Sequence, residues 1–145
     1  MTTIGITGAS GALGRRTAEY VLKSHPAGDL VLFSRSPDSL VEFADAGVTV
    51  RAADFDRPDT LVEGFAGIDV LLLISTDALE RRTTQQLAAV AAAAGAGVKR
   101  IVYTSLPNAG GDFPARLQPL SDSHAATEEA LRAGGPSWTI LRNAQ

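Results

Sequence analysis

The chain has 145 residues, of which 45% are hydrophobic, and a formal net charge of −3 at neutral pH. These values predict one soluble globular domain that can bury a core, and they exclude a disordered or fibrous chain. No apolar run approaches the roughly 18 residues that a bilayer-spanning helix needs, and the N-terminus enters a strand without a charged leader. We therefore expect a cytoplasmic protein without a membrane span.

The composition also excludes several kinds of catalytic and binding site. The chain contains no cysteine, which excludes disulfides, thiolate metal sites and cysteine nucleophiles. Its two histidines, His25 and His124, are far apart in sequence and offer little for a metal cluster. The 13 basic and 16 acidic residues include no basic block, so the chain lacks the electrostatic footprint of a nucleic-acid partner.

Strands and helices are predicted to alternate along the whole chain. Apolar residues 3–6 predict a strand, and the spacing of Leu13, Thr17 and Val21 predicts an amphipathic helix after a glycine-rich turn. Further strands are predicted at residues 30–33, 48–52, 68–74, 100–104 and 137–141, and further helices at residues 37–46, 58–65, 79–94 and 121–133. The buried side of the alanine-rich helix is expected to carry Leu87, Val90, Ala91 and Ala94.

This alternation predicts an α/β fold with a parallel sheet. Strands that are joined by helical crossovers are most simply parallel, and right-handed crossovers leave few topologies. The doubly wound order 3-2-1-4-5-6 of a Rossmann fold fits six such strands and a dinucleotide site best. No linker divides the chain, so residues 1–145 are expected to form a single Rossmann domain.

The segment of residues 7–14 places Gly8, Gly11 and Gly14 where the first strand gives way to the first helix. Gly8 suits a tight turn, Gly11 lets phosphates approach the main chain, and Gly14 lets the helix pack closely. The free N–H groups of the helix start then face an anion. We predict that this loop holds a dinucleotide pyrophosphate, with Thr7, Gly8, Ser10, Gly11, Ala12, Leu13 and Gly14 as cofactor-binding residues.

Arg35 follows the second strand, about twenty residues after the glycine loop, and lies between Ser34 and Ser36. An NAD-specific site would have a carboxylate there to bind the ribose 2′-hydroxyl, whereas a guanidinium suits the 2′-phosphate of NADP. The alternative is a solvated arginine that follows a strand. Asp38 is near enough to leave NAD as a second candidate beside NADPH.

Asp54 follows the third strand, where its carboxylate could accept a hydrogen bond from an adenine amino group. Acidic residues at such positions also begin helices, so both interpretations stay open. Asp56 is the better capping candidate for the next helix, because Pro58 occupies the first turn and Asp59 follows three residues after Asp56.

Hydroxyl side chains end the fourth and fifth predicted strands, at the sheet edge where open α/β folds bind ligands. They are Ser75, Thr76, Thr104 and Ser105. Each is a candidate cofactor contact, and each could instead satisfy local backbone groups.

His124, near the start of the last helix, is the candidate catalytic residue. It could donate a proton or a hydrogen bond to a reduced oxygen, although an exposed polar histidine is the simpler interpretation. His25 precedes Pro26 and is expected at the surface. Trp138 alternates with Ile140 and is expected to fill core.

Several segments together carry a family pattern. They are residues 6–14, Arg35, residues 71–75, residues 103–106, His124 with Thr127 and Glu128, and residues 141–143. On these residues the chain resembles the NmrA-like atypical short-chain dehydrogenases, and within them the type 2 NAD(P)H:quinone oxidoreductases. The similar stretches occur in the same order across the whole chain.

The resemblance implies a bound NADPH whose diphosphate lies on the glycine loop and whose 2′-phosphate lies near Arg35. Its nicotinamide half would lie near Ser75, Thr104 and Asn143. Hydride would pass to a quinone, flanked by the loop of residues 106–119. Such transfer mainly requires that the protein orient and shield both partners.

The chain departs from this family in its length, since members are roughly twice as long and have a C-terminal region that covers the substrate. Ala144 and Gln145 stand where the family has a glycine and aromatic residues. We therefore expect cofactor binding more than turnover from this chain. It also lacks the Tyr-x-x-x-Lys pair of ordinary short-chain dehydrogenases, because Ser24 follows Tyr20 at that spacing and Pro107 follows Tyr103.

These observations favour an NADPH-dependent oxidoreductase that reduces a small quinone-like acceptor. One alternative is a non-catalytic redox sensor that binds NADP(H), as NmrA-like regulators are thought to do. Another is a fragment without activity whose sheet edge pairs with missing sequence. The sequence leaves the oligomeric state open, and a homo-oligomer is compatible with it.

Overall fold

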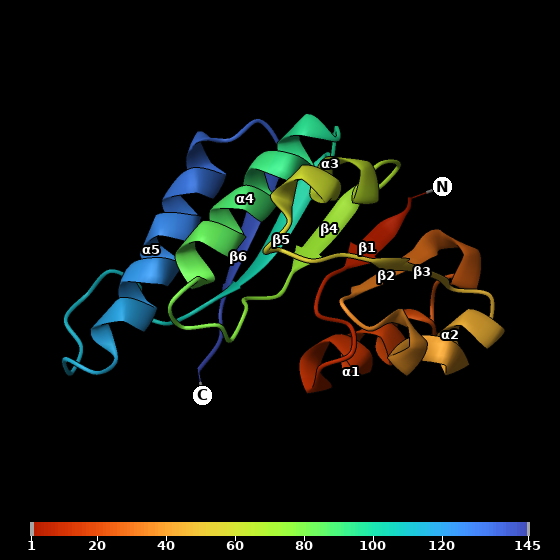
Figure 1. Cartoon of the computed structure of the whole chain (residues 1–145), viewed down its shortest axis with the longest axis horizontal. Helices are drawn as coiled ribbons and strands as arrows, with labels where there is room; N and C mark the ends of the chain where they lie inside the picture. The colour runs from red at the N-terminus through yellow and green to blue at the C-terminus, as the bar shows by residue number, and fades with distance from the viewer. Residues whose placement is uncertain (1, 145) are drawn as a thin grey trace.

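The computed structural model describes residues 2–144, which form a six-stranded parallel sheet flanked by helices (Figure 1). The strands are β1 (Ile4–Ile6), β2 (Leu30–Ser34), β3 (Thr49–Ala52), β4 (Val70–Leu73), β5 (Arg100–Ser105) and β6 (Ser137–Arg142). Their order is β3-β2-β1-β4-β5-β6, and every neighbouring pair is parallel. The predicted doubly wound order is confirmed.

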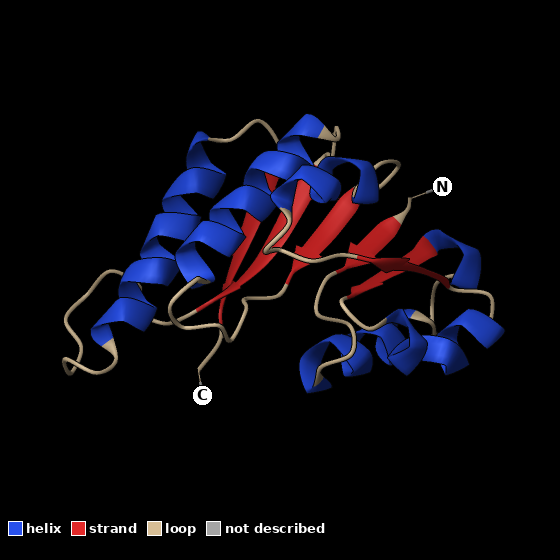
Figure 2. Ribbon diagram, viewed as in Figure 1, coloured by secondary structure: helices blue, strands red, loops and turns tan. Residues whose placement is uncertain are grey.

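Helices cover both faces of the sheet (Figure 2). The α-helices are α1 (Ala12–Val21), α2 (Val41–Asp45), α3 (Leu61–Gly64), α4 (Arg82–Gly95) and α5 (Gln118–Ala133), and short 3-10 turns occupy Ala27–Asp29, Pro37–Leu40 and Pro58–Thr60. Helices α1 and α2 lie on one face, and α3, α4 and α5 lie on the other. No helix within residues 2–144 has both the length and the apolar character needed to cross a bilayer.

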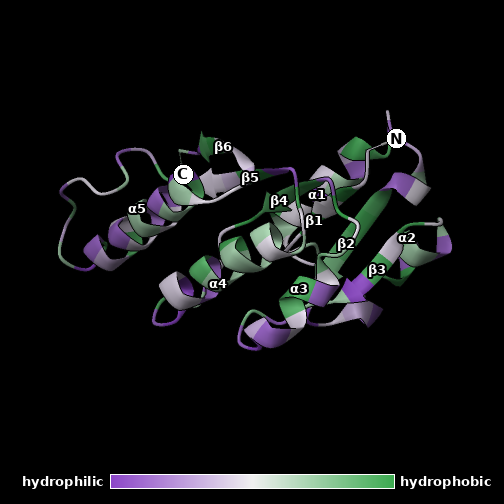
Figure 3. Ribbon diagram, turned by 90° about the horizontal axis from the view of Figure 1, so that it is seen from above, coloured by the Kyte–Doolittle hydropathy of each residue, from purple (hydrophilic) through white to green (hydrophobic). Residues whose placement is uncertain are grey.

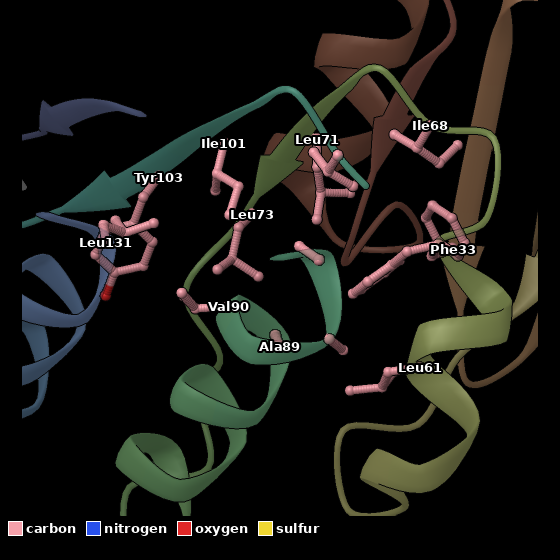
Figure 4. Close-up of a cluster of buried hydrophobic side chains, with 14 of the residues drawn as sticks. Phe33, Leu61, Ile68, Leu71, Leu73, Ala89, Val90, Ile101, Tyr103 and Leu131 are labelled. Atoms are coloured by element: carbon pink, nitrogen blue, oxygen red, sulfur yellow. The ribbon is translucent and has the colours of Figure 1, made fainter. Parts of the chain in front are cut away.

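Each face of the sheet has its own hydrophobic core, because side chains alternate along a strand. On β2, Phe33 points to the α3–α5 side and Leu32 to the α1–α2 side, and both are buried. Figure 4 shows Phe33 with Leu71, Leu73 and residues of α3 and α4 in the first of these cores. Complete burial of each such side chain stabilises the fold by about 1.5–3 kcal/mol. Seen from above, β2 and β4 are accordingly hydrophobic, whereas hydrophilic residues recur along α5 (Figure 3).

The buried side of α4 differs from the prediction. Ala89, Val90, Ala92 and Ala93 are buried, whereas Leu87, Ala91 and Ala94 are exposed. With alanines along most of its length, the helix gives little periodic signal. Its buried side also includes the polar residues Arg82, Gln85 and Gln86, which interrupt the apolar pattern.

Other local predictions also need correction. Trp138 does not fill core: 42% of its surface is exposed on the edge strand β6, and the Arg132 guanidinium carbon lies 5.5 Å from its ring centroid. Asp56 does not cap a helix, because its carboxylate accepts hydrogen bonds from Arg81 and, at 2.8 Å, from Gln85. Helix α5 begins at Gln118, with Pro119 in its first turn, where the missing N–H costs nothing.

Candidate functional site

Two adjoining clefts lie at the carboxyl ends of the strands. They flank the point between β1 and β4 where the strand order reverses, the position at which open α/β sheets bind ligands. The first cleft, of about 310 Å³, is bounded by Thr7, Gly8, Ser10, Gly11 and Gln85 together with residues 33–35, 53–55 and 74–78. The second, of about 350 Å³, is bounded by residues 74–77 and 104–106 together with Leu13, Arg82, His124 and Asn143.

The glycine loop is a tight turn that leads directly into α1. Gly8 has φ +61°, and its carbonyl accepts the N–H of Gly11 at 3.1 Å. The N–H of Ala9 donates to the carbonyl of Phe33 at 3.2 Å, which ties the loop to β2. Helix α1 has no side-chain cap and no acidic residue in its first turn. Its first N–H groups are thus available to an anion.

Gly14 acts by packing rather than by lining a cleft. A Cβ at this position would lie 2.7 Å from the Cα of Ala9 and closer still to the carbonyl oxygen of Gly8. Only glycine lets α1 lie against the loop at this distance. Ala12 also lines neither cleft. These two predicted cofactor residues belong to the helix that supports the loop.

Arg35 lies at the wall of the first cleft, among hydroxyl groups. Ser34 donates its hydroxyl to Ser10 at 3.2 Å and accepts the N–H of Ser36 at 2.9 Å. Arg35 is exposed and takes part in none of the ion pairs found within residues 2–144. Arg15, by contrast, is paired with Glu42. The cleft therefore has an unpaired guanidinium on its wall.

The first cleft also contains Asp54, which was predicted as a site residue, and Gln85, which was not. One carboxylate oxygen of Asp54 accepts the N–H of Asp56 at 2.9 Å and so stabilises its own loop. Gln85 is buried, and its Oε1 has no hydrogen-bond partner within the described chain. The two consecutive glutamines in an alanine-rich helix were the signal that could have identified it.

The hydroxyl groups at the strand ends have different roles. Thr7 Oγ1 donates to the carbonyl of Leu72 at 3.3 Å and accepts the N–H of Ile74 at 3.0 Å. Thr104 Oγ1 accepts the N–H of Ser75 at 2.9 Å. These two threonines fix the segment after β4. Thr76 Oγ1 is buried without a partner in the described residues, and Thr76 lines both clefts.

Glu128 of α5 holds the end of β6 in place. Its carboxylate accepts hydrogen bonds from Ser105 at 2.6 Å, from Arg142 at 2.7 and 3.1 Å, and from Arg132 at 3.2 Å. Burial opposes ionisation of Glu128, but these hydrogen bonds hold its pKa below the usual value. The N–H of Asn143 donates to the carbonyl of Ser105 at 3.1 Å, which places Asn143 at the second cleft.

His124 lies in a buried polar cluster, so its interpretation as an exposed histidine is wrong. Only 4% of its surface is exposed. Its Nδ1 lies 2.6 Å from the hydroxyl of Tyr103, a core residue beside Leu131 (Figure 4), and its Nε2 lies 3.4 Å from Nη1 of Arg82. Burial, followed by the charge of Arg82, lowers the pKa of His124 to about 4. Burial also raises the pKa of Tyr103 to about 12.

This burial makes the stability of the chain depend on pH. The folded chain keeps His124 neutral down to about pH 4, whereas the unfolded chain protonates it near pH 6.5. The unfolded state binds more protons between these values, so stability is full above about pH 6.5 and falls as pH drops. His124 should contribute a loss of about 2 kcal/mol between pH 7 and pH 5.

Urea unfolding at both pH values would measure this contribution, with His124→Gln as the comparison. His124→Gln removes this titration, so the variant should lose less stability than the parent. Equal losses would contradict the neutral, buried state of His124.

The structure brings the predicted site residues together, apart from Ala12 and Gly14. The first cleft is lined by Thr7, Gly8, Ser10, Gly11, Arg35, Asp54, Ser75 and Thr76, and the second by Leu13, Ser75, Thr76, Thr104, Ser105, His124 and Asn143. The buried residues Arg82 and Gln85 of α4 also line the clefts and were not predicted. Among residues 2–144, histidines and carboxylates form no group of three that could hold a metal ion.

Residues 8–145 match the sequence model of a family described as NAD(P)H-binding. Quinone oxidoreductase 2 of Escherichia coli is 39% identical over 142 residues, which cover 97% of this chain and 48% of that protein. An NmrA-like family domain-containing oxidoreductase of Aspergillus flavus is 36% identical over 94% of this chain and 46% of that protein. The chain thus spans about half the length of the curated relatives it matches.

Solved structures give the same result. Citrobacter sp. triphenylmethane reductase complexed with NADP(H) is similar with a TM-score of 0.91 and 35% identity, over 98% of this chain and 49% of that chain. The NADPH-dependent quinone oxidoreductase of Escherichia coli complexed with NADPH has a TM-score of 0.89 and 38% identity, over 97% of this chain and 48% of that chain. Because the family match extends over nearly the whole sequence, the chain belongs to the NAD(P)H-binding family, and its resemblance to NmrA-like reductases and quinone oxidoreductases is confirmed.

Proposed function

We propose that this chain binds NADPH along both clefts and forms the cofactor domain of a reductase that delivers hydride to a quinone-like acceptor. The unpaired guanidinium of Arg35 beside the glycine loop is the observation that carries this proposal. A guanidinium binds a phosphate through two parallel hydrogen bonds, and nothing within the described chain competes for it.

The residues present fit NADPH along the length of the two clefts. The diphosphate would lie against Gly8, Ser10 and Gly11, where the first N–H groups of α1 are uncapped. A 2′-phosphate would reach Arg35 from there. Adenine would lie beside Asp54 and Gln85 in the first cleft, where the Oε1 of Gln85, which has no partner among the described residues, can accept from its amino group.

The nicotinamide half would then lie in the second cleft. Ser75 and Asn143 are at its edge, and the buried Thr76 Oγ1, which has no partner among the described residues, can hydrogen-bond to the cofactor. Leu13 and Leu106 add apolar surface on which a flat aromatic acceptor could pack. The Citrobacter and Escherichia coli relatives are named as reductases of triphenylmethane dyes and of quinones.

Bound NADPH would supply a hydride, and the protein would orient and shield both reactants. The chain lacks a Tyr-x-x-x-Lys pair to protonate a carbonyl oxygen as it is reduced to an alcohol. A quinone suits such a site, because its reduced form is a stable anion that water can protonate. Asn143 and the strand-end hydroxyls would position the cofactor, while Glu128 holds the end of β6 through Arg142.

The test of this function is quinone-dependent oxidation of NADPH, followed by loss of the absorbance of reduced nicotinamide. It should be run with the 145-residue chain and with a hybrid that adds the remaining half of Escherichia coli quinone oxidoreductase 2. We expect a benzoquinone-dependent rate in the hybrid, with NADPH preferred over NADH. A hybrid that binds NADPH but shows no such rate would contradict the proposal and favour an NADP(H)-binding sensor.

A further inference from the structure

Arg82 is a buried cation without an anionic partner. It lies in the first turn of α4, only 8% of its surface is exposed, and it lines the second cleft. Arg82 takes part in none of the ion pairs found within residues 2–144. Burial lowers the pKa of its guanidinium, so the surroundings oppose the charge. A guanidinium in this state is costly unless an anion from outside the described chain binds it.

The hydrogen bonds of Arg82 leave part of its guanidinium free. A guanidinium has donors and no acceptor, so Nη1 donates to Nε2 of His124, at 3.4 Å. His124 is neutral at pH 7 and does not balance the charge of Arg82. Nε is buried without a partner, and Nη2 makes no hydrogen bond within residues 2–144. Nη2 is therefore the nitrogen that can reach a ligand in the second cleft.

Asp77 is the acidic residue that lines the second cleft together with Arg82. Its charge acts on Arg82, but the two side chains form no ion pair. The backbone before Asp77 is held by α4, because the N–H of Thr76 donates to Oε1 of Gln86 at 3.0 Å. The first turn of α4 contains no acidic residue either. A ligand anion would thus find Arg82 unpaired, with Asp77 as its competitor.

The phosphates of NADPH do not account for the charge of Arg82. The proposed function places them at the glycine loop and at Arg35, which line the first cleft, whereas Arg82 lines the second. The nicotinamide ring of NADPH carries no negative charge that could pair with a guanidinium. The cofactor therefore leaves Arg82 free for the acceptor.

We propose that the second cleft binds an aromatic acceptor that carries a carboxylate, and that Arg82 binds this carboxylate. The proposal rests on the proposed function and adds the charge of the acceptor to it. The carboxylate would accept from Nη2 and give Arg82 its anionic partner. The aromatic ring would pack on Leu13, Ile74 and Leu106, which are apolar residues of the same cleft. A neutral acceptor would leave the guanidinium unpaired, so Arg82 determines specificity for anionic acceptors.

The affinities of the chain for 2-naphthoate and 2-naphthamide test this site without turnover. The two probes have nearly the same size and shape and differ in charge. Chemical-shift titration of the 145-residue chain, with and without NADP⁺, measures both affinities even where they are weak. We expect naphthoate to bind about tenfold more tightly than naphthamide. Arg82→Met should abolish this preference and change naphthamide binding little.

Two further variants separate the role of Arg82 from a general effect of charge. Arg100→Met is the matched control, because it removes the same charge from an exposed arginine at the amino end of β5, opposite the clefts. It should change the binding of neither probe. Asp77→Asn removes the competing carboxylate and should strengthen naphthoate binding by roughly two- to fivefold, with naphthamide binding unchanged.

A parent chain that binds neither probe, or binds both equally, would overturn the proposal. Equal effects of Arg82→Met and Arg100→Met would do the same. If Arg82→Met fails to fold, the preference of the parent and its increase in Asp77→Asn decide the question.

Calorimetry with NADP⁺ on the same samples reports on the cofactor site separately. A preference for naphthoate in a chain that does not bind NADP⁺ would retain the anion site and reject the proposed function. If Arg82→Met weakened NADP⁺ binding as strongly as naphthoate binding, Arg82 would belong to the cofactor site and the proposal would fail.

Discussion

Replacing Arg35 by glutamine is expected to weaken NADPH binding by about 10- to 150-fold and to change NADH binding little. Arg35 is exposed at the wall of the first cleft and is unpaired within residues 2–144, so its loss should disturb no other contact of the protein. A charged hydrogen bond to a phosphate contributes about 1.5–3 kcal/mol, which corresponds to this range. Isothermal titration calorimetry with both nucleotides measures the difference.

Lys23→Gln is the matched control for Arg35→Gln. It removes one positive charge just beyond the far end of α1, where Lys23 is exposed over the ring of Tyr20. Its effect on both nucleotides should be small and equal, because exposed charges at this distance are screened by salt. If Arg35→Gln weakened NADPH and NADH equally, the guanidinium would not contact the 2′-phosphate.

Gly14→Ala is expected to lower the free energy of unfolding by about 1–3 kcal/mol, which is the usual cost of forcing an extra carbon into a packed site. The added Cβ would meet the backbone of Ala9 at 2.7 Å and that of Gly8 at a shorter distance. Backbone atoms cannot avoid the added Cβ by a change of rotamer, so α1 or the glycine loop must move. NADPH affinity should fall along with stability, because the loop carries the predicted diphosphate site.

The comparison for this variant is Gly64→Ala in α3. A Cβ at Gly64 would have nothing within 4 Å, and its φ is not in the left-handed region. Alanine there should therefore be neutral or stabilising by roughly 0.4–1 kcal/mol. Thermal unfolding of both variants checks the pair, and equal melting temperatures would contradict the packing role of Gly14.

The strand order could be predicted because each step depends on local sequence. A glycine-rich turn after an apolar strand, followed by alternating strands and helices, leaves few right-handed parallel topologies. The glycine loop and Arg35 could be placed for the same reason, because they follow the first two strands directly.

The buried cluster could not be predicted in this way, because its members come from distant parts of the chain. Arg82 of α4 and His124 of α5 are 42 residues apart. Tyr103, which contacts His124, lies on β5. The sequence of a helix does not indicate which of its polar residues will be buried against a strand. The buried side of α4 could not be predicted for another reason. Its many alanines make the sides of the helix similar in hydrophobicity.

The most direct test of the proposed cofactor site is calorimetric titration of the 145-residue chain with NADPH, using NADH and NADP⁺ as comparisons. We expect one NADPH to bind per chain, more tightly than NADH, with NADP⁺ also bound. A folded chain that bound none of these nucleotides, or that bound NADH as tightly as NADPH, would contradict the placement of the 2′-phosphate at Arg35 and the function built on it.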